Sequence, residues 1–303
     1  MKTHQFSTAL SSQLGKPNRF PSPAKLNLFL YINGKLPNGY HELQTLFQFL
    51  DFGDWLEIDV REQDNRILIT PEIPNLKTEE NLIYRAAKLL QEKANISKGA
   101  NIHLEKILPI GGGVGGGSSN AATTLVALNH LWNADLSLIE LTKLGLTLGA
   151  DVPIFIHGHA AFAEGVGEKM TYCEPAEKWF VVLKPESAIS TAAIFNDPNL
   201  PRNTPKHSLE ELLDFPYKND CEKVVINLYP DVEKALSWLL QYAPARLTGT
   251  GACVFAEFDH EADAQVCFQR KPPELFGFIA KGLNVSPLHQ WLKQHNLSNS
   301  STT

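Results

Sequence analysis

The chain has 303 residues, which at roughly 150 residues per domain predicts two domains. Its 43% hydrophobic and 20% charged residues are ordinary for a folded protein and exclude a disordered, collagen-like or coiled-coil chain. The net charge of -6 argues against a nucleic-acid binder, which usually carries a basic face. Because no apolar run approaches the ~18 residues that span a bilayer, we expect neither an integral membrane protein nor a membrane partner.

The cysteines and the two ends of the chain bear on its location. The four cysteines are widely spaced without a C-x-x-C pair, which predicts reduced, mostly buried thiols in a cytoplasmic protein. Residues 1–20 contain basic residues, Ser and Thr but no acid, a composition that faintly resembles a transit peptide. We interpret 1–20 as a flexible arm without a secretion signal, and 296–303 as a flexible tail.

The N-terminal half mixes strands and helices. Ala24–Ile32 alternates with period two, which predicts a strand with one buried face and with Lys25 and Asn27 on its polar face. Pro37-Asn38-Gly39 predicts a turn that delivers Tyr40 and His41. Further periodicities predict strands at 55–60, 66–70 and 101–110, and a helix over 82–90.

The remaining pattern favours an α+β fold over a doubly wound one, because strands and helices do not alternate regularly. A helix follows the glycine-rich segment, and Ser137-x-x-Glu140 is a capping box for another that Gly149 closes. The pattern of the second half predicts a strand at 179–184, a polar stretch at 196–205 and helices near 209–213 and 231–241. It then predicts a strand at 252–258, a helix from 261 and a strand at 276–280. This last unit resembles a ferredoxin-like split β-α-β arrangement.

The most informative segment is Pro109-Ile-Gly-Gly-Gly-Val-Gly-Gly-Gly-Ser-Ser119, with six glycines in seven positions. So many glycines are entropically costly, so they indicate that backbone with positive φ must approach a ligand closely. Before a helix N-terminus, such a loop directs unpaired N–H groups and the positive end of the helix dipole at an anion. The segment therefore predicts phosphate binding.

Three well-known nucleotide motifs fit this segment poorly. Ser118 stands where the P-loop requires Lys. The spacing Gly111-x-Gly113-x-x-Gly116 fits the dinucleotide fingerprint, but the acid expected ~20 residues on, Asp135, opens a helix rather than ending a strand. Residues 51–53 spell the protein-kinase triplet Asp-Phe-Gly, but they precede the glycines and no H-R-D accompanies them.

The glycine loop resembles the phosphate loop of the GHMP kinases, which transfer the ATP γ-phosphate to small-molecule alcohols. Two further segments agree with this family, Ser22-Pro-Ala-Lys-Leu-Asn27 and Leu247-Thr-Gly-Thr-Gly-Ala-Cys253. Within this family, four motifs resemble those of the branch that acts on a cytidine-bearing alcohol. They are PAKLNL from Pro23, NGYHELQT from Asn38, GADVP from Gly149 and PRNTP from Pro201. The resemblance covers residues 21 to 290.

The resemblance implies a GHMP kinase fold in two domains. Residues 21–172 would form an ATP-binding domain like ribosomal protein S5 domain 2, and residues 173–295 a ferredoxin-like domain. The implied substrate is 4-diphosphocytidyl-2-C-methyl-D-erythritol, phosphorylated on its 2-hydroxyl in the non-mevalonate route to isoprenoid precursors. A homoserine- or mevalonate-type kinase is the alternative within the fold. No nucleic acid and no obligate protein partner is implied.

Two residues are candidates for the chemistry of phosphoryl transfer. Asp151 follows Gly149 in a short loop, where it is suited to act as a general base or merely to cap the next segment. Lys25 shares its strand face with Asn27, so both can point into one cleft. The family's catalytic aspartate and lysine match these two positions, so the resemblance implies that Asp151 and Lys25 are catalytic.

The resemblance also implies the ligand-binding residues. Tyr40 and Phe195 would sandwich the cytosine and His41 would hydrogen-bond to it, with Asn27 and Thr191 also on the substrate. The implied ATP-binding residues are Pro109, Ile110, Gly111, Gly112, Gly113, Val114, Gly115, Gly116, Gly117, Ser118 and Ser119. Mg²⁺ should accompany ATP, held largely by phosphate and water. The sequence does not assign a protein ligand for Mg²⁺. Ser118 and Ser119 are candidates, and capping of the following helix is the alternative role for both.

Two remaining motifs have simple interpretations. His157-Gly-His159 has the spacing of a metal pair on a strand, but without a third ligand nearby we interpret both histidines as structural. Thr248-Gly-Thr-Gly251 is expected to bring the backbone of the second domain close to the active site, with a plain tight turn as the alternative.

Overall fold

The computed structural model describes residues 18–74 and 76–295. The strands in these ranges are β1 (Arg19–Lys35), β2 (His41–Arg61), β3 (Ile67–Thr70), β4 (Gly99–Glu105), β5 (Ala161–Glu164), β6 (Lys169–Tyr172), β7 (Trp179–Lys184), β8 (Ala245–Leu247), β9 (Val254–Phe258) and β10 (Phe276–Leu283). The helices are η1 (Thr78–Glu80), α2 (Leu82–Ala94), α3 (Gly116–Leu131), α4 (Leu138–Leu148), α5 (Val152–His157), α6 (Thr191–Asn196), α7 (Leu209–Asp214), α8 (Glu222–Leu228), α9 (Pro230–Leu239), α10 (Glu261–Gln269) and α11 (Pro287–Gln294).

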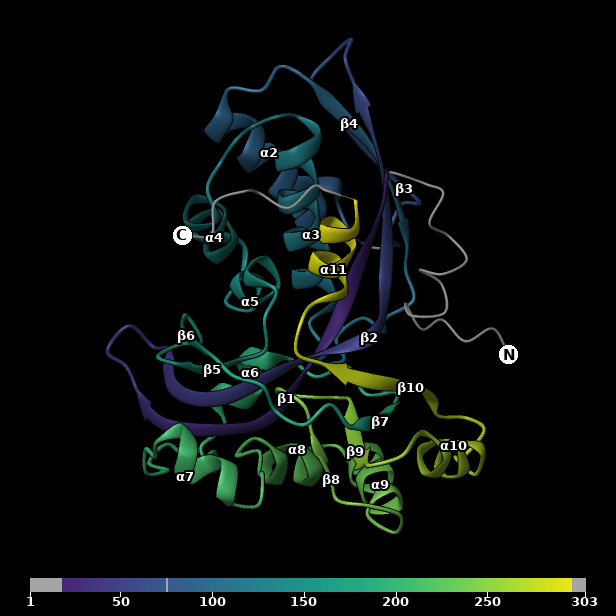
Figure 1. Cartoon of the computed structure of the whole chain (residues 1–303). Coiled ribbons are helices and arrows are strands. Elements are labelled where there is room, and N and C mark those ends of the chain that lie inside the picture. Colours follow the sequence, from purple (N-terminus) through teal and green to yellow (C-terminus); the bar gives the residue numbers. More distant parts are fainter. Residues whose placement is uncertain (1–17, 75, 296–303) are drawn as a thin grey trace.

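The long antiparallel pair of β1 and β2 connects the two halves of the molecule (Figure 1). Along β2, the C-terminal part pairs with β4 and the N-terminal part with β5, while β10 pairs with its centre. The path β3-β4-β2-β10-β7-β9-β8 is therefore continuously hydrogen-bonded. Gly39, with a φ of 87°, lies in the predicted turn between β1 and β2.

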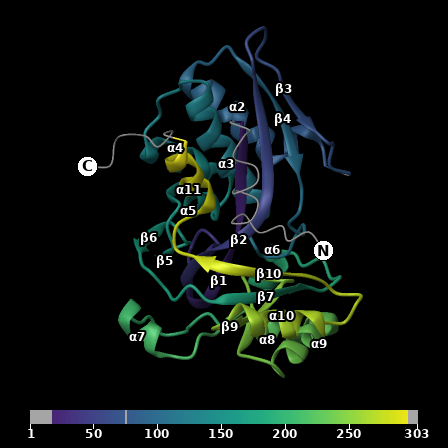
Figure 2. The ribbon, with the colours of Figure 1, turned by 45° about the vertical axis from the view of Figure 1, so that its right-hand side comes forward.

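In the upper half of Figure 1, helices α2, α3, α4 and α11 lie on one side of β1, β2 and β4. Asn81 caps α2 by accepting from the N–H of Ile83, and the predicted capping box of Ser137 and Glu140 begins α4. Although α11 is the last helix in the chain, it packs here, as the two views in Figures 1 and 2 agree. Its Trp291 ring lies 4.6 Å from that of Phe20.

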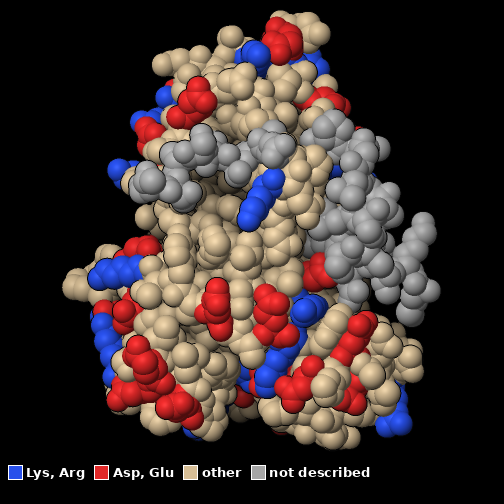
Figure 3. All heavy atoms as spheres, viewed as in Figure 1, with Lys and Arg blue, Asp and Glu red and all other residues tan. Residues whose placement is uncertain are grey.

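In the lower half, β7 lies between β10 and β9, and α10 connects these two outer strands. This arrangement is the predicted split β-α-β unit, and α9 packs on the same sheet. The α+β prediction is confirmed. On the face in Figure 3, acidic and basic side chains are interspersed, and acidic ones gather over the lower half. Within the described ranges, no helix combines the length and apolarity needed to cross a membrane.

Four sequence predictions need correction. The first is the single buried face predicted for β1, which is buried on both faces. On one face Leu26 and Ile32 pack in two hydrophobic clusters, and on the other Lys25 and Asn27 are buried against polar partners. The expected arm is too long, since β1 begins at Arg19; residues 1–17 and 296–303 lie outside the described residues.

The other two corrections concern strand lengths. The strand predicted at 55–60 is the end of β2, whose first part lacks a simple alternation. The strand predicted over 101–110 ends at Glu105, since a buried carboxylate draws the next N–H groups out of the sheet. The thiol prediction holds, because the four cysteines are free, with three buried and Cys173 half-buried.

Candidate active site

A cavity of about 1020 Å³ lies where the two halves meet, and it gathers the predicted site residues. Its wall includes Lys25, Asn27, Tyr40, His41, Pro109 to Ser118, Asp151, Thr191 and Phe195. These residues come from five separate segments of the chain. The predicted residue that does not line it is Ser119, which is fully buried.

The glycine loop has a backbone that only glycine adopts easily. Gly111, Gly113 and Gly115 have φ values of 68°, 76° and 77°, in the left-handed region. A Cβ on Gly113 would lie 2.5 Å from the carbonyl oxygen of Thr248, so no side chain fits there. α3 begins directly after Gly115, and the first-turn N–H groups of a helix have no acceptor within it. The loop and helix therefore present N–H groups and a positive dipole end suited to phosphate.

The turn at 248–251 contacts this loop, as the sequence predicts. Cys253 donates its backbone N–H to the carbonyl oxygen of Gly112 at 3.0 Å. A Cβ on Gly112 would lie 2.7 Å from the Cys253 sulfur, so the two backbones pack without space for a side chain. The second half of the chain thus supports one side of the glycine loop.

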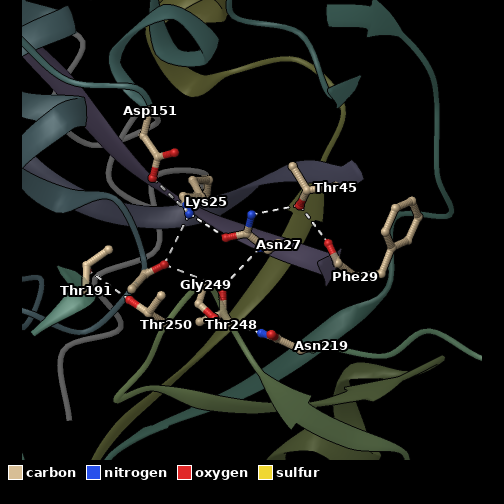
Figure 4. A network of polar contacts seen from close by, with 11 residues as sticks. Lys25, Asn27, Phe29, Thr45, Asp151, Thr191, Asn219, Thr248, Gly249 and Thr250 are labelled. Atoms are coloured by element: carbon tan, nitrogen blue, oxygen red, sulfur yellow. Dashed lines mark hydrogen bonds and ion pairs between the residues drawn. The ribbon is translucent and has the colours of Figure 1, made fainter. Parts of the chain in front are cut away.

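Lys25 occupies the centre of the site, as Figure 4 shows, and is only 2% exposed. Its Nζ lies 2.6 Å from Oδ1 of Asn27, 3.2 Å from Oδ2 of Asp151 and 3.3 Å from the carbonyl oxygen of Gly113. A lysine ammonium has three donors, and here three oxygens surround it. A buried charge needs such partners, so the position of the ammonium is fixed by the aspartate, the neighbouring amide and the glycine loop together.

Asp151 immediately precedes α5, yet its side chain makes no capping hydrogen bond. The carboxylate instead forms the ion pair with Lys25, and its side chain is 39% exposed against 3% for the lysine. Because Asp151 also lines the cavity, this carboxylate is accessible to a ligand while one oxygen faces a fixed cation. The geometry favours a chemical role over the capping role that the sequence left open.

Asn27 connects this pair to the second half of the molecule. Its backbone N–H donates to Oγ1 of Thr248 at 3.0 Å, and its Nδ2 donates to Oγ1 of Thr45 at 2.8 Å. Figure 4 shows both bonds beside the contact with Lys25. The Asn27 side chain thus orients the lysine as well as lining the cavity.

Aromatic side chains line the end of the cavity away from the glycine loop. Tyr40 is 62% exposed, whereas His41 is buried and its ring stacks on Phe195, with centroids 5.0 Å apart and planes at 27°. Burial, and then the charges of Arg202 and Lys35, lower the pKa of His41. The hydroxyl groups of Thr191 and Thr250, which also line the cavity, are 2.9 Å apart. This end is suited to a flat ring with a polar edge.

A buried carboxylate that the sequence analysis did not assign supports the glycine loop from below. Asp54 of β2 is fully buried, and its Oδ1 accepts from the N–H groups of Ile107 and Leu108, both at 2.7 Å. Its Oδ2 accepts from Lys106 at 2.7 Å and from Asn120 at 3.0 Å. Four donors on one carboxylate fix the segment that leads into the loop. The signal in the sequence that could have identified Asp54 was an aspartate within a long apolar strand.

The same network accounts for Ser119. The hydroxyl of Ser22 donates to Oγ of Ser119 at 2.9 Å, and Asn120 donates to the Ser22 oxygen at 2.8 Å. The Ser119 side chain therefore faces the interior rather than the cavity, while its place in the implied ATP-binding loop stays a prediction. Ser118, one residue earlier, does line the cavity.

The motifs considered as alternatives lie elsewhere. Asp135 lies in the irregular segment between α3 and α4 with a φ of 53°, not at the end of a strand, as the dinucleotide fingerprint would require. His157 uses both ring nitrogens, toward the hydroxyl of Tyr172 at 2.8 Å and that of Thr142 at 3.3 Å, which supports a structural role. Across residues 18–74 and 76–295, no group of three or more His, Cys, Asp or Glu is arranged to hold a metal.

Comparison with known proteins agrees with this geometry. Residues 81–159 match the GHMP kinases N terminal domain, and residues 202–270 match the GHMP kinases C terminal domain. The chain is 80% identical over 298 residues to 4-diphosphocytidyl-2-C-methyl-D-erythritol kinase of Haemophilus influenzae (strain Rd), covering 97% of this chain and 95% of that protein. It is 70% identical over 292 residues to the kinase of the same name from Pasteurella multocida (strain Pm70), covering 96% and 99%.

Solved structures extend the comparison. The crystal structure of a 4-(cytidine 5'-diphospho)-2C-methyl-D-erythritol kinase superposes with a TM-score of 0.77 at 30% identity, covering 87% of this chain and 98% of that one. A mevalonate kinase superposes with a TM-score of 0.63 at 17% identity, covering 88% and 99%, and shares the fold. With these identities over nearly the whole length, the chain belongs to the 4-diphosphocytidyl-2-C-methyl-D-erythritol kinase family of the GHMP kinases, and it is an ATP-dependent kinase.

Proposed function

We propose that this chain transfers the γ-phosphate of ATP to the 2-hydroxyl of 4-diphosphocytidyl-2-C-methyl-D-erythritol, producing the 2-phosphate and ADP. The observation that supports the proposal is that the Lys25–Asp151 pair, the glycine loop and the stacked rings of His41 and Phe195 all line one cavity. A substrate with a cytidine at one end and a hydroxyl at the other spans that arrangement. The names of the most similar relatives support the same substrate.

Phosphoryl transfer requires positioning and charge stabilisation more than covalent help from the protein. The hydroxyl oxygen attacks the γ-phosphorus, the bond from that phosphorus to the bridging oxygen of ADP breaks, and the hydroxyl proton passes to a carboxylate oxygen of Asp151. Lys25 orients that carboxylate through the ion pair and offsets the charge that develops on the transferred group. The glycine loop and the N-terminus of α3 hold the phosphates of ATP.

Residues 21–172 form the proposed ATP-binding domain, and residues 173–295 complete the cleft. Mg²⁺ bound to ATP would neutralise phosphate charge, and Ser118 and Asp151 are two oxygen-bearing side chains of the cavity that could hold it. Tyr40 and Phe195 would hold the cytosine by its two faces. We assign the reaction to the cytoplasm, which the four free thiols support.

The test is ADP release with Mg·ATP and a panel of alcohols: the cytidyl substrate, homoserine, mevalonate and galactose. We expect strong turnover on the cytidyl substrate alone. Turnover on homoserine or mevalonate instead would retain the kinase and discard the roles of Tyr40, His41 and Phe195. ATP binding without turnover on any of the four would contradict the proposed reaction.

A further inference from the structure

Arg202 lies in the segment after α6 and joins the two sides of the aromatic pocket. Its Nη1 donates to the carbonyl oxygen of Leu200 at 3.1 Å, and its Nη2 donates to those of Phe195 at 2.9 Å and Asp197 at 2.7 Å. Its Nε lies 3.1 Å from Nε2 of His41, a residue 161 positions earlier in the chain. The guanidinium is thus fixed by three carbonyls and directs its remaining contact at the histidine.

The chemistry of the two groups fixes the direction of the bond to His41. A guanidinium is always protonated and has donors only, so Nε of Arg202 donates and Nε2 of His41 accepts. An accepting Nε2 carries no hydrogen, and a neutral imidazole then carries its proton on Nδ1. Burial and the nearby cations Arg202 and Lys35 lower the pKa of His41, which favours that neutral form.

The other ring nitrogen is available to a ligand. His41 lines the cavity, and its Nδ1 makes no hydrogen bond with any residue of the described ranges. This unpaired Nδ1 is not one of the buried unpaired polar atoms, so it is accessible. Stacking on Phe195 fixes the plane of the ring. The pocket therefore contains an oriented N–H donor that the protein itself does not use.

We propose that Arg202 makes the pocket selective for cytosine over uracil, by committing His41 to present Nδ1–H to N3 of the base. The inference rests on the proposed function, since it assumes a cytidine-bearing substrate. Cytosine has a lone pair at N3, whereas uracil has N3–H, so with uracil two donors would face each other. A site built around one hydrogen bond rejects the analogue that cannot form it far more strongly than a site built on shape.

The variant that tests this role is Arg202→Met, which removes the Nε–H donor and allows His41 to adopt the Nε2–H tautomer. We expect kcat/KM for the cytidyl substrate, relative to its uridine analogue, to fall about tenfold or more, mainly through KM. Arg202→Lys keeps a charged donor and should recover part of the selectivity. Lys206→Met is the control, because Lys206 lies in the same segment but pairs with Glu42. A merely structural role for Arg202 would weaken both substrates equally and leave the ratio unchanged.

A second measurement observes the His41 tautomer in the wild-type protein itself and uses one variant only to assign the signal. Nitrogen-15 NMR of the wild-type protein distinguishes the two tautomers, and the signal lost in His41→Gln assigns His41 among the ten histidines. We expect Nδ1–H without substrate; an Nε2–H tautomer would overturn the inference. The proposed function and the role of Arg202 fail in different ways. If the wild-type protein does not turn over the cytidyl substrate, the proposed function is contradicted. If it does, but Arg202→Met has the same kcat/KM ratio of cytidyl substrate to uridine analogue as the wild type, only the role of Arg202 is contradicted.

Discussion

The two ends of the cavity are built by different means. At the end formed by the glycine loop, where we propose that phosphate binds, the cavity is lined by loop backbone and the Lys25–Asp151 pair, and the fully buried Asp54 supports the segment before the loop. At the aromatic end they are side chains from the turn before β2, from the first residue of β2 and from the short helix α6, and Tyr40 is 62% exposed. Binding to phosphate needs a rigid array of N–H groups, whereas a flat base needs ring faces and one polar edge. Substitutions at the first end should therefore lower turnover, ATP affinity or stability, and those at the second should raise KM for the alcohol.

The largest effect is expected for Asp151→Asn, which preserves size but cannot accept the hydroxyl proton. We expect kcat to fall by ~10²-fold or more with the KM for ATP nearly unchanged, measured by ADP release. Asp135→Asn is the control, because Asp135 is the acid that a dinucleotide-binding protein would need. If Asp151→Asn keeps near-wild-type turnover, the carboxylate is not the base; if Asp135→Asn is the slower enzyme, the phosphate loop has been misassigned.

The support beneath the loop predicts a loss of stability. In Asp54→Asn one oxygen still accepts from Ile107 and Leu108, but the new amide group faces the donors of Lys106 and Asn120. We expect the free energy of unfolding to fall by about 2 kcal/mol, since buried donors lose their acceptor. Denaturant unfolding measures it, with the exposed Asp59→Asn on the same strand as control. Equal stability of the two variants would remove Asp54 from the support of the loop.

The loop itself distinguishes backbone strain from steric contact. Gly115→Ala would adopt a φ of 77° and place its Cβ 2.7 Å from Cζ of Phe155 and 3.2 Å from Cε of Lys25. We expect the KM for ATP to rise about tenfold, since the left-handed region alone costs about 1–2 kcal/mol. Gly111→Ala shares the positive φ, but its Cβ would meet nothing within 4 Å. A matching loss in both variants would mean that strain, not contact with Phe155 and Lys25, governs the loop.

The same contrast explains which parts of the site the sequence predicts. Glycines before a helix and a lysine on a strand are local patterns, and local patterns indicated the phosphate loop and a cleft for Lys25. His41 and Phe195 come from distant segments, so only resemblance to a family suggested that both face one base, and the stacking of their two rings was not predicted. The contact between Arg202 and His41 spans 161 positions and has no local signal.

Burial misled the sequence analysis in a consistent direction. Lys25 and Asn27 on alternate positions of β1 indicated a polar face that opens into a cleft, opposite a single buried face. Both are nearly inaccessible, since the carboxylate of Asp151 and the hydroxyl of Thr45 supply partners from other segments. The inward direction of the Ser119 side chain has the same cause, because its partner Ser22 comes from β1. Periodicity predicts which side of a strand a residue takes, but not whether a third segment covers that side.

The smallest effect is expected at the exposed end, where Tyr40→Ala removes one ring face from the pocket. Stacking of a base on an aromatic side chain is worth about 1 kcal/mol at its lower limit, so KM for the cytidyl substrate should rise about fivefold while kcat and the KM for ATP stay constant. Tyr40→Phe keeps the ring and should behave as wild type. Tyr40 is a cleaner probe than Phe195, which also packs on the hydrophobic cluster of the second half. A fall in kcat for Tyr40→Ala would mean that base binding also positions the hydroxyl, so the two ends would not act independently.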